Sequence, residues 1–81
     1  VNTERAIALY EKAAASGDSF GKWRLGVMID QGKAPGTPER AVALFREAAA
    51  DKSPGAMASL GKMYAEGRGV ARDYEAAMRY Y

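Results

Sequence analysis

The stretch ERAVALFREAAA at residues 39–50 decides the fold, because it repeats ERAIALYEKAAA at residues 4–15, 35 positions earlier. The same shift places Leu25-Gly26 on Leu60-Gly61. A fixed period in this range indicates stacked units, each of which buries its apolar face against its neighbours. The sequence therefore predicts a solenoid, and the functional question becomes what its surface binds.

The composition is that of one small globular unit with few chemical options. Its 81 residues are 48% hydrophobic and 27% charged. The net charge is +2, and positive and negative residues are interspersed along the chain, so no basic patch of the kind that binds nucleic acid is present in the sequence. The lack of cysteine excludes disulfides and a thiol nucleophile, and the lack of histidine excludes His-ligated metals and Ser-His catalysis. We therefore expect no cofactor, no metal and no nucleic-acid partner. No run of about 18 apolar residues occurs, so we also expect no membrane span.

Apolar residues recur at helical spacing, which predicts an all-α fold. Thr37 and Ser53 are expected to cap helices that begin with proline, Asp18 or Ser19 to cap another, and Gly17 to end the first. Four full helices and part of a fifth are predicted, over residues 3–15, 19–30, 38–51, 54–66 and 73–81.

Each repeat pairs two kinds of helix. One kind carries a Leu-Gly pair, at Leu25-Gly26 and Leu60-Gly61, and the other places an aromatic residue, Tyr10 or Phe45, between alanines. Glycine inside a helix costs about 1 kcal/mol relative to alanine, so its use twice at one register indicates a steric need. Small residues let two helix axes approach, and the aromatic side chain fills the remaining gap. Gly61→Val is therefore predicted to destabilise the fold by about 1–3 kcal/mol.

These residues carry a family resemblance. The second half of the chain resembles the Sel1-like repeat, whose pattern is a small residue, Leu-Gly, Tyr, Gly-x-Gly-Val, Asp, Ala and two aromatic residues. The matching positions are Ala56, Leu60, Gly61, Tyr64, Gly67, Gly69, Val70, Asp73, Ala76, Tyr80 and Tyr81. The preceding unit matches at Leu25 and Gly26, but Ile29 replaces the tyrosine and the second glycine and valine are missing. The period and the Gly-x-Gly-Val loop favour this family over plain tetratricopeptide repeats.

The resemblance implies an all-α, right-handed α-solenoid of antiparallel helix pairs, similar to tetratricopeptide proteins, with about two and a third repeats in one domain. The units would span about 1–17, 18–52 and 53–81, as a piece of a longer array. Arrays of this kind usually need at least about three units, so we expect partly uncovered apolar faces on both end helices, with self-association through them as one option. Many relatives are bacterial, and a cytoplasmic, periplasmic or secreted location fits equally.

The resemblance also implies a non-catalytic scaffold that binds a protein or peptide on its concave face. On that architecture Leu25, Gly26 and Ile29 face the neighbouring helix, and Trp23 lies on another side, where an aromatic residue often binds a partner. The candidate groove residues are Phe20, Trp23, Val27, Asp30, Lys62 and Glu66. The alternative is that Trp23 packs against the preceding helix.

Two Ser-x-x-Lys patterns, Ser19/Lys22 and Ser59/Lys62, suggest an alternative, because this spacing lets a lysine take the serine proton in acyl-transferring enzymes. The Ser-Asp-Asn and Lys-Thr-Gly companions are absent, and the two copies lie 40 rather than 35 positions apart. We interpret Ser19 as a helix cap and Lys62 as a solvated group. A serine or carboxylate hydrolase or penicillin-binding activity on cell-wall material, and a purely structural spacer, are the alternative functions.

The remaining charged motifs have structural interpretations. Glu11 and Glu47 are expected on solvated helix faces, in charge pairs one turn apart. Gly67-Arg68-Gly69 lacks the strand and the Lys-Ser/Thr ending of a phosphate-binding loop, so it is interpreted as a turn. Arg68 and Arg72 would then be surface groups.

Overall fold

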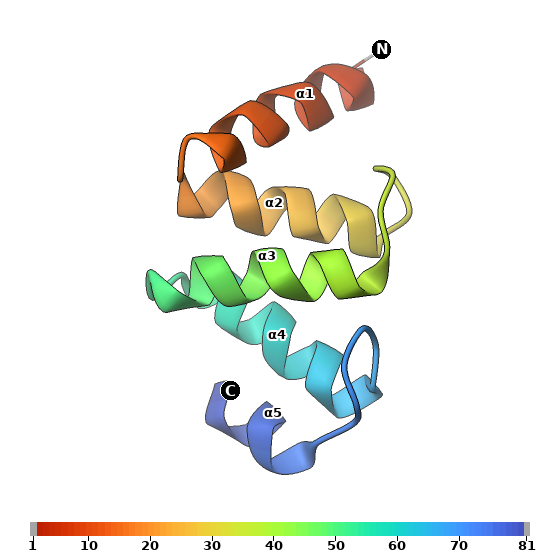
Figure 1. Cartoon of the computed structure of the whole chain (residues 1–81), viewed down its shortest axis with the longest axis vertical. Coiled ribbons are helices and arrows are strands. Elements are labelled where there is room, and N and C mark those ends of the chain that lie inside the picture. The colour runs from red at the N-terminus through yellow and green to blue at the C-terminus, as the bar shows by residue number, and fades with distance from the viewer. Residues whose placement is uncertain (1, 81) are drawn as a thin grey trace.

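The computed structural model describes residues 2–80 as five stacked helices (Figure 1). They are α1 (Asn2–Ala15), α2 (Ser19–Asp30), α3 (Pro38–Ala50), α4 (Pro54–Glu66) and α5 (Tyr74–Tyr80). Successive helices reverse direction, and the stack is elongated, measuring 39 × 23 × 15 Å. No strand occurs within the described range. The predicted all-α architecture, with four full helices and a shorter fifth, is confirmed.

Local capping chemistry sets where the helices begin. The hydroxyls of Thr37 and Ser53 accept the backbone N–H three residues on, each at 3.3 Å, and a proline follows at the first helical position. Asp73 accepts a backbone N–H at the start of α5 in the same way. Asp18 is the cap of α2, where it accepts the N–H of Phe20 at 3.0 Å. The interpretation of Ser19 as the cap was therefore wrong, because the carboxylate one residue earlier fills that position.

Left-handed residues end the helices, as the sequence predicted for Gly17, which has a φ of 91°. Gly67 ends α4 with a φ of 68°. The position after α3 that corresponds to Gly17 is occupied by Lys52, the one non-glycine residue with positive φ, 63°, in residues 2–80. The chain thus makes the same turn after α1 and after α3. Glycine suits the left-handed conformation after α1, whereas after α3 a lysine has to adopt it.

The small residues have the predicted packing role. Gly26 of α2 lies so close to α3 that a Cβ atom there would be 2.6 Å from Cε1 of Phe45. Phe45 is almost completely buried between Ala41 and Ala48, which are also inaccessible. The core contains Leu25, Met28, Ile29, Ala34, Ala41, Val42, Leu44, Phe45, Leu60 and Met63. The close helix approach inferred from the Leu-Gly pair is therefore confirmed for Gly26.

In the last unit, residues 53–81, the residues of the Sel1-like pattern make packing contacts. Leu60 and Gly61 are buried in α4, and Ala76 is buried in α5. Tyr64 stacks on Tyr80 of α5, with ring centroids 6.0 Å apart and planes within 4°. Gly69 has a φ of 72° and packs against Pro38, whose carbonyl oxygen would lie 2.5 Å from an added Cβ. Tyr81, the last residue of the motif, lies outside the described residues.

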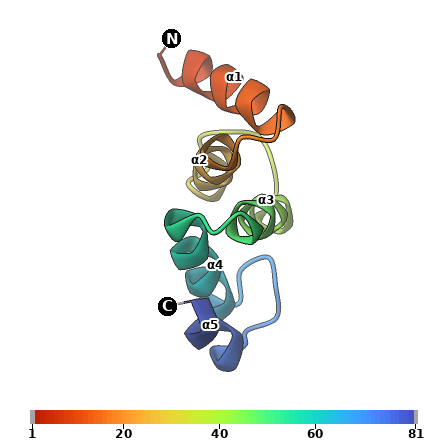
Figure 2. The same ribbon diagram turned by 90° about the vertical axis from the view of Figure 1, so that its left-hand side faces the viewer.

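The stack has two unlike sides. The first helices of successive units, α2 and α4, contact each other, whereas α1 and α3, or α3 and α5, do not within residues 2–80. Figure 2 shows α2 and α4 toward one side of the stack and α3 toward the other. The side on which α2 and α4 contact each other is called the inner side below.

Both end helices carry exposed apolar side chains, as expected. Leu9 of α1 is 67% exposed, and Met78 of α5 is 75% exposed. No side chain of α1 is fully buried. Across residues 2–80, the helices are too short or too polar to traverse a lipid bilayer.

Candidate functional site

Three aromatic rings form a continuous row across α1 and α2. Phe20 packs edge-to-face with Tyr10, with ring centroids 6.3 Å apart, and with Trp23, at 5.7 Å. Such pairs are favourable beyond the area they bury. The side chain of Phe20 nevertheless stays 56% exposed. These three residues, called the aromatic row below, therefore present a fixed, accessible ring at the centre.

Trp23 extends the row to α4. Its indole Nε1 donates a hydrogen bond to the hydroxyl of Ser59 at 3.1 Å. A Cβ atom on Gly55 would lie 2.5 Å from the indole, so the ring fills space that only a glycine leaves free. Trp23 is half-buried, and these contacts are with α4, the first helix of the next unit, and not with the preceding helix α1 that the sequence offered as an alternative.

Arg24 lies over the same row. Its guanidinium carbon is 5.8 Å from the ring centroid of Tyr10 and 5.4 Å from that of Trp23. A cation within about 6 Å of an aromatic face is attracted by the negative face of the ring. Arg24 is half-buried and makes no ion pair with any residue between 2 and 80. The row is therefore contacted by a cation that has no carboxylate partner among the residues that the structure describes.

Of the other candidate groove residues, Asp30 has a structural partner. One of its oxygens lies 2.5 Å from Nη2 of Arg68, which also donates to the carbonyl oxygen of Asp30 at 3.3 Å. Glu66 lies on the other side of the same guanidinium, at 3.6 Å. Arg68 is a surface group as expected, with 40% of its side chain exposed, but it also joins the end of α2 to the loop after α4. Arg72 is exposed, as expected.

The last two candidates occupy different surroundings. Val27 is half-buried and packs against the core. Lys62 is exposed on α4, three residues after Ser59. Residues three apart on a helix share a face, so Lys62 lies one turn beyond the residue that contacts Trp23. The structure thus groups Phe20 and Trp23, and it places Asp30 and Glu66 together around Arg68.

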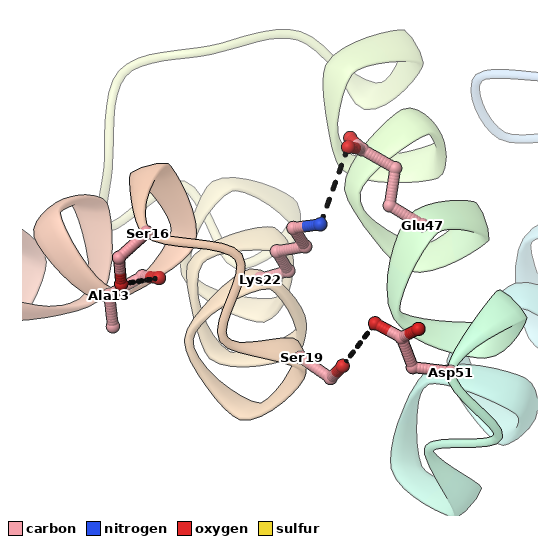
Figure 3. A network of polar contacts seen from close by, with 6 residues as sticks. All are labelled: Ala13, Ser16, Ser19, Lys22, Glu47 and Asp51. Carbon is pink, nitrogen blue, oxygen red and sulfur yellow. Dashed lines mark hydrogen bonds and ion pairs between the residues drawn. The ribbon is translucent and has the colours of Figure 1, made fainter.

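In the first Ser-x-x-Lys pattern, both residues contact carboxylates of α3 and of the turn after it (Figure 3). The hydroxyl of Ser19 donates to a carboxylate oxygen of Asp51 at 2.5 Å, and Nζ of Lys22 lies 3.5 Å from Glu47. Ser59 accepts the indole N–H of Trp23. Glu47 is on a solvated face as expected, but its described partner comes from α2 rather than from one turn along α3. Residues 2–80 also form no enclosed pocket that could surround a small substrate.

Sequence reasoning missed four residues around the row: Tyr10 as part of it, Arg24, Gly55 and Ser59. Arg24 follows Phe20 by four positions, so helical spacing could have placed the two on one face. Gly55 and Ser59 could not be found that way, because they meet Trp23 across the boundary between two units.

Comparison with known proteins agrees with this architecture. A family model for the Sel1 repeat matches residues 1–18, 19–53 and 54–81. The chain belongs to the Sel1 repeat family. Sel1 repeats generally form protein-interaction scaffolds and are typically not enzymes. Among curated proteins, none matches this Sel1-repeat chain.

A solved structure with the same fold is a protective antigen present in uropathogenic Escherichia coli strains, described as displaying an SLR fold. It is 36% identical to this chain, and the superposition has a TM-score of 0.87. The match covers 93% of this chain and 16% of that antigen. The Sel1-repeat assignment made from the Leu-Gly and Gly-x-Gly-Val residues is confirmed.

Proposed function

We propose that this Sel1-repeat chain binds a protein or peptide on its inner side, with Phe20 and Trp23 as the principal contacts and no catalytic step. The observation that carries the proposal is the exposure of Phe20 between two rings that restrain it. Solvent-facing aromatic side chains with defined positions supply much of the energy at protein interfaces. Val27, Lys62 and Glu66 are proposed as flanking contacts.

Preorganisation supports the same proposal. The indole of Trp23 is fixed by Ser59 and by the space above Gly55, and Phe20 is fixed in turn by Trp23 and Tyr10. A surface whose side chains are already ordered loses little conformational entropy when a partner binds. In this proposal Asp30 contributes indirectly, because its contact with Arg68 sets the relative position of α2 and α4.

A peptide-display selection on the folded chain tests the proposal. Peptides enriched on the wild-type chain should lose most of their affinity for Phe20→Ala, because that change removes the exposed ring and little buried structure. Tyr74→Ala is the matched control, since Tyr74 is an equally exposed aromatic residue, at 60%, with its own arginine, Arg72, 5.5 Å from the ring. Circular dichroism checks that both variants keep their helix content.

Two results would overturn the proposal. One is a selection that enriches no peptide above the level seen with an unrelated helical protein. The other is a set of enriched peptides whose binding is unchanged in Phe20→Ala, or equally reduced in Tyr74→Ala, because the aromatic row would then not be the binding surface.

A further inference from the structure

We infer that the segment recognised by the aromatic row is an acidic-apolar peptide, in which an apolar side chain packs on Phe20 and a nearby Asp or Glu side chain binds Arg24. This inference rests on the proposed function and specifies the chemistry of its partner. It depends on two observations about charge at the row and on one about the shape of the surface.

The first observation is the contrast between Arg24 and the other half-buried cations. Lys22 is paired with Glu47, and Arg68 is paired with Asp30 and Glu66. The guanidinium carbon of Arg24 lies 5.8 Å from the Tyr10 ring centroid and 5.4 Å from that of Trp23, and Arg24 has no carboxylate partner within residues 2–80. A guanidinium stacked on aromatic rings keeps its in-plane N–H donors free, and their fork geometry matches a carboxylate.

The second observation concerns the charged groups near the row besides Arg24. Asp18 precedes Phe20 by two residues, and its carboxylate accepts the N–H of Phe20 as the cap of α2. On α4, one turn beyond Ser59, Lys62 is exposed, and its amine is not ion-paired within the part of the chain that the structure describes. Arg24 at the row and Lys62 one turn beyond Ser59 are thus two cations without an ion-pair partner in residues 2–80, and such cations favour a partner that brings negative charge.

The third observation concerns the shape of the surface. A chain-terminal carboxylate is usually captured by converging backbone N–H groups. The described residues offer no enclosed pocket there, and the row runs openly from α1 across α2 to α4. An open strip suits a peptide that passes through, so the carboxylate is assigned to an internal Asp or Glu side chain.

The test uses four degenerate peptide pools that share a fixed Leu. Three of them differ in the residue two positions before this Leu, and the fourth differs in its C-terminus. In an extended peptide, residues two positions apart are separated by about 6–7 Å. Phe20 and Arg24 lie about one helical turn apart, about 5–6 Å along the axis of α2, so the two peptide side chains can reach both residues. The variable residue is Glu, Gln or Lys in three pools with blocked termini. The fourth pool has Gln and a free C-terminal carboxylate. Binding is measured by fluorescence anisotropy with labelled peptides.

The Glu pool should bind the wild-type chain about 2–5-fold more tightly than the Gln pool, the range typical of one ion pair at a partly exposed site. This preference should disappear in Arg24→Gln, decrease in Arg24→Lys and remain in Arg72→Gln, the control arginine stacked on Tyr74. Raising the ionic strength should also reduce it. Arg24→Lys keeps the charge and most of the side-chain stem, so it remains informative if Arg24→Gln folds poorly.

The other outcomes separate this inference from the proposed function. Equal binding of all pools, with loss in Phe20→Ala, would overturn the acidic partner and leave a binding surface in place. A free C-terminus that binds as well as the Glu pool would overturn the internal side chain as the source of the carboxylate. No binding by any pool, together with no selected peptide, would overturn both.

Discussion

Gly26 of α2 and Phe45 of α3 are in contact at a distance that leaves no room for a methyl group, because a Cβ on residue 26 would lie 2.6 Å from the ring. Phe45 is only 1% exposed, so the ring has no free space into which it could move. The contact sets the separation of the two helices in the first complete unit. The Leu-Gly pair of α4 is buried at the same register.

Gly26→Ala is expected to destabilise the fold by about 1–3 kcal/mol, as overpacking of a filled core usually does. The sign is informative, since the same change at an open helix position would stabilise by about 1 kcal/mol. Urea denaturation followed by circular dichroism measures the effect. In a Phe45→Leu background the penalty should shrink, because leucine lacks the Cε1 atom. A penalty that is equal in both backgrounds would contradict the contact as its cause.

Lys52→Gly is expected to stabilise the chain by about 1 kcal/mol. Lys52 has a φ of 63° after α3, and this left-handed conformation costs an L-residue about 1–2 kcal/mol, part of which glycine loses again through backbone entropy. Gly17→Ala, at the corresponding position after α1, should be destabilising even though nothing lies within 4 Å of the added Cβ. Thermal melts of the two variants should therefore shift in opposite directions, and shifts of the same sign would count against backbone conformation as the cause.

Arg68→Met should destabilise by about 1 kcal/mol, because it removes an ion pair and a hydrogen bond from Asp30 at the end of α2. Arg68→Lys should restore only part of this, since one ammonium group replaces a fork of donors. Lys22→Met is the comparison, and its cost should stay below about 0.5 kcal/mol because Glu47 is 57% exposed. Equal costs for Arg68→Met and Lys22→Met in urea denaturation would contradict a special role for Arg68.

Incubation with a β-lactam is expected to leave the mass of the protein unchanged in intact-protein mass spectrometry. The hydroxyl of Ser19 is directed to Asp51, and that of Ser59 receives the indole N–H of Trp23, so the described contacts pair neither serine with a lysine base. A stoichiometric adduct that disappears in Ser19→Ala or Ser59→Ala would revive the acyl-transfer alternative.

Most of the fold could be predicted from the sequence, because the relevant chemistry is local. Thr37 and Ser53 cap helices through N–H groups three residues away, and Gly17 and Gly67 end them through their own backbone angles. The 35-residue period predicted the repeating units, and Gly26 predicted a close approach of two helices, because a glycine that recurs inside a helix indicates a steric need. Helix order and the close approach of α2 to α3 followed from these signals.

What only the tertiary structure decided is how side chains meet between helices that are distant in the sequence. Ser19 bonds to a residue 32 positions away, Trp23 to one 36 positions away, and Arg68 to one 38 positions away. Spacing along one helix fixes which face a residue shares, but the helix that covers this face, and the direction of each side chain, depend on packing. The position of Arg24 over two rings is of this kind, and so is the space that Gly55 leaves for an indole.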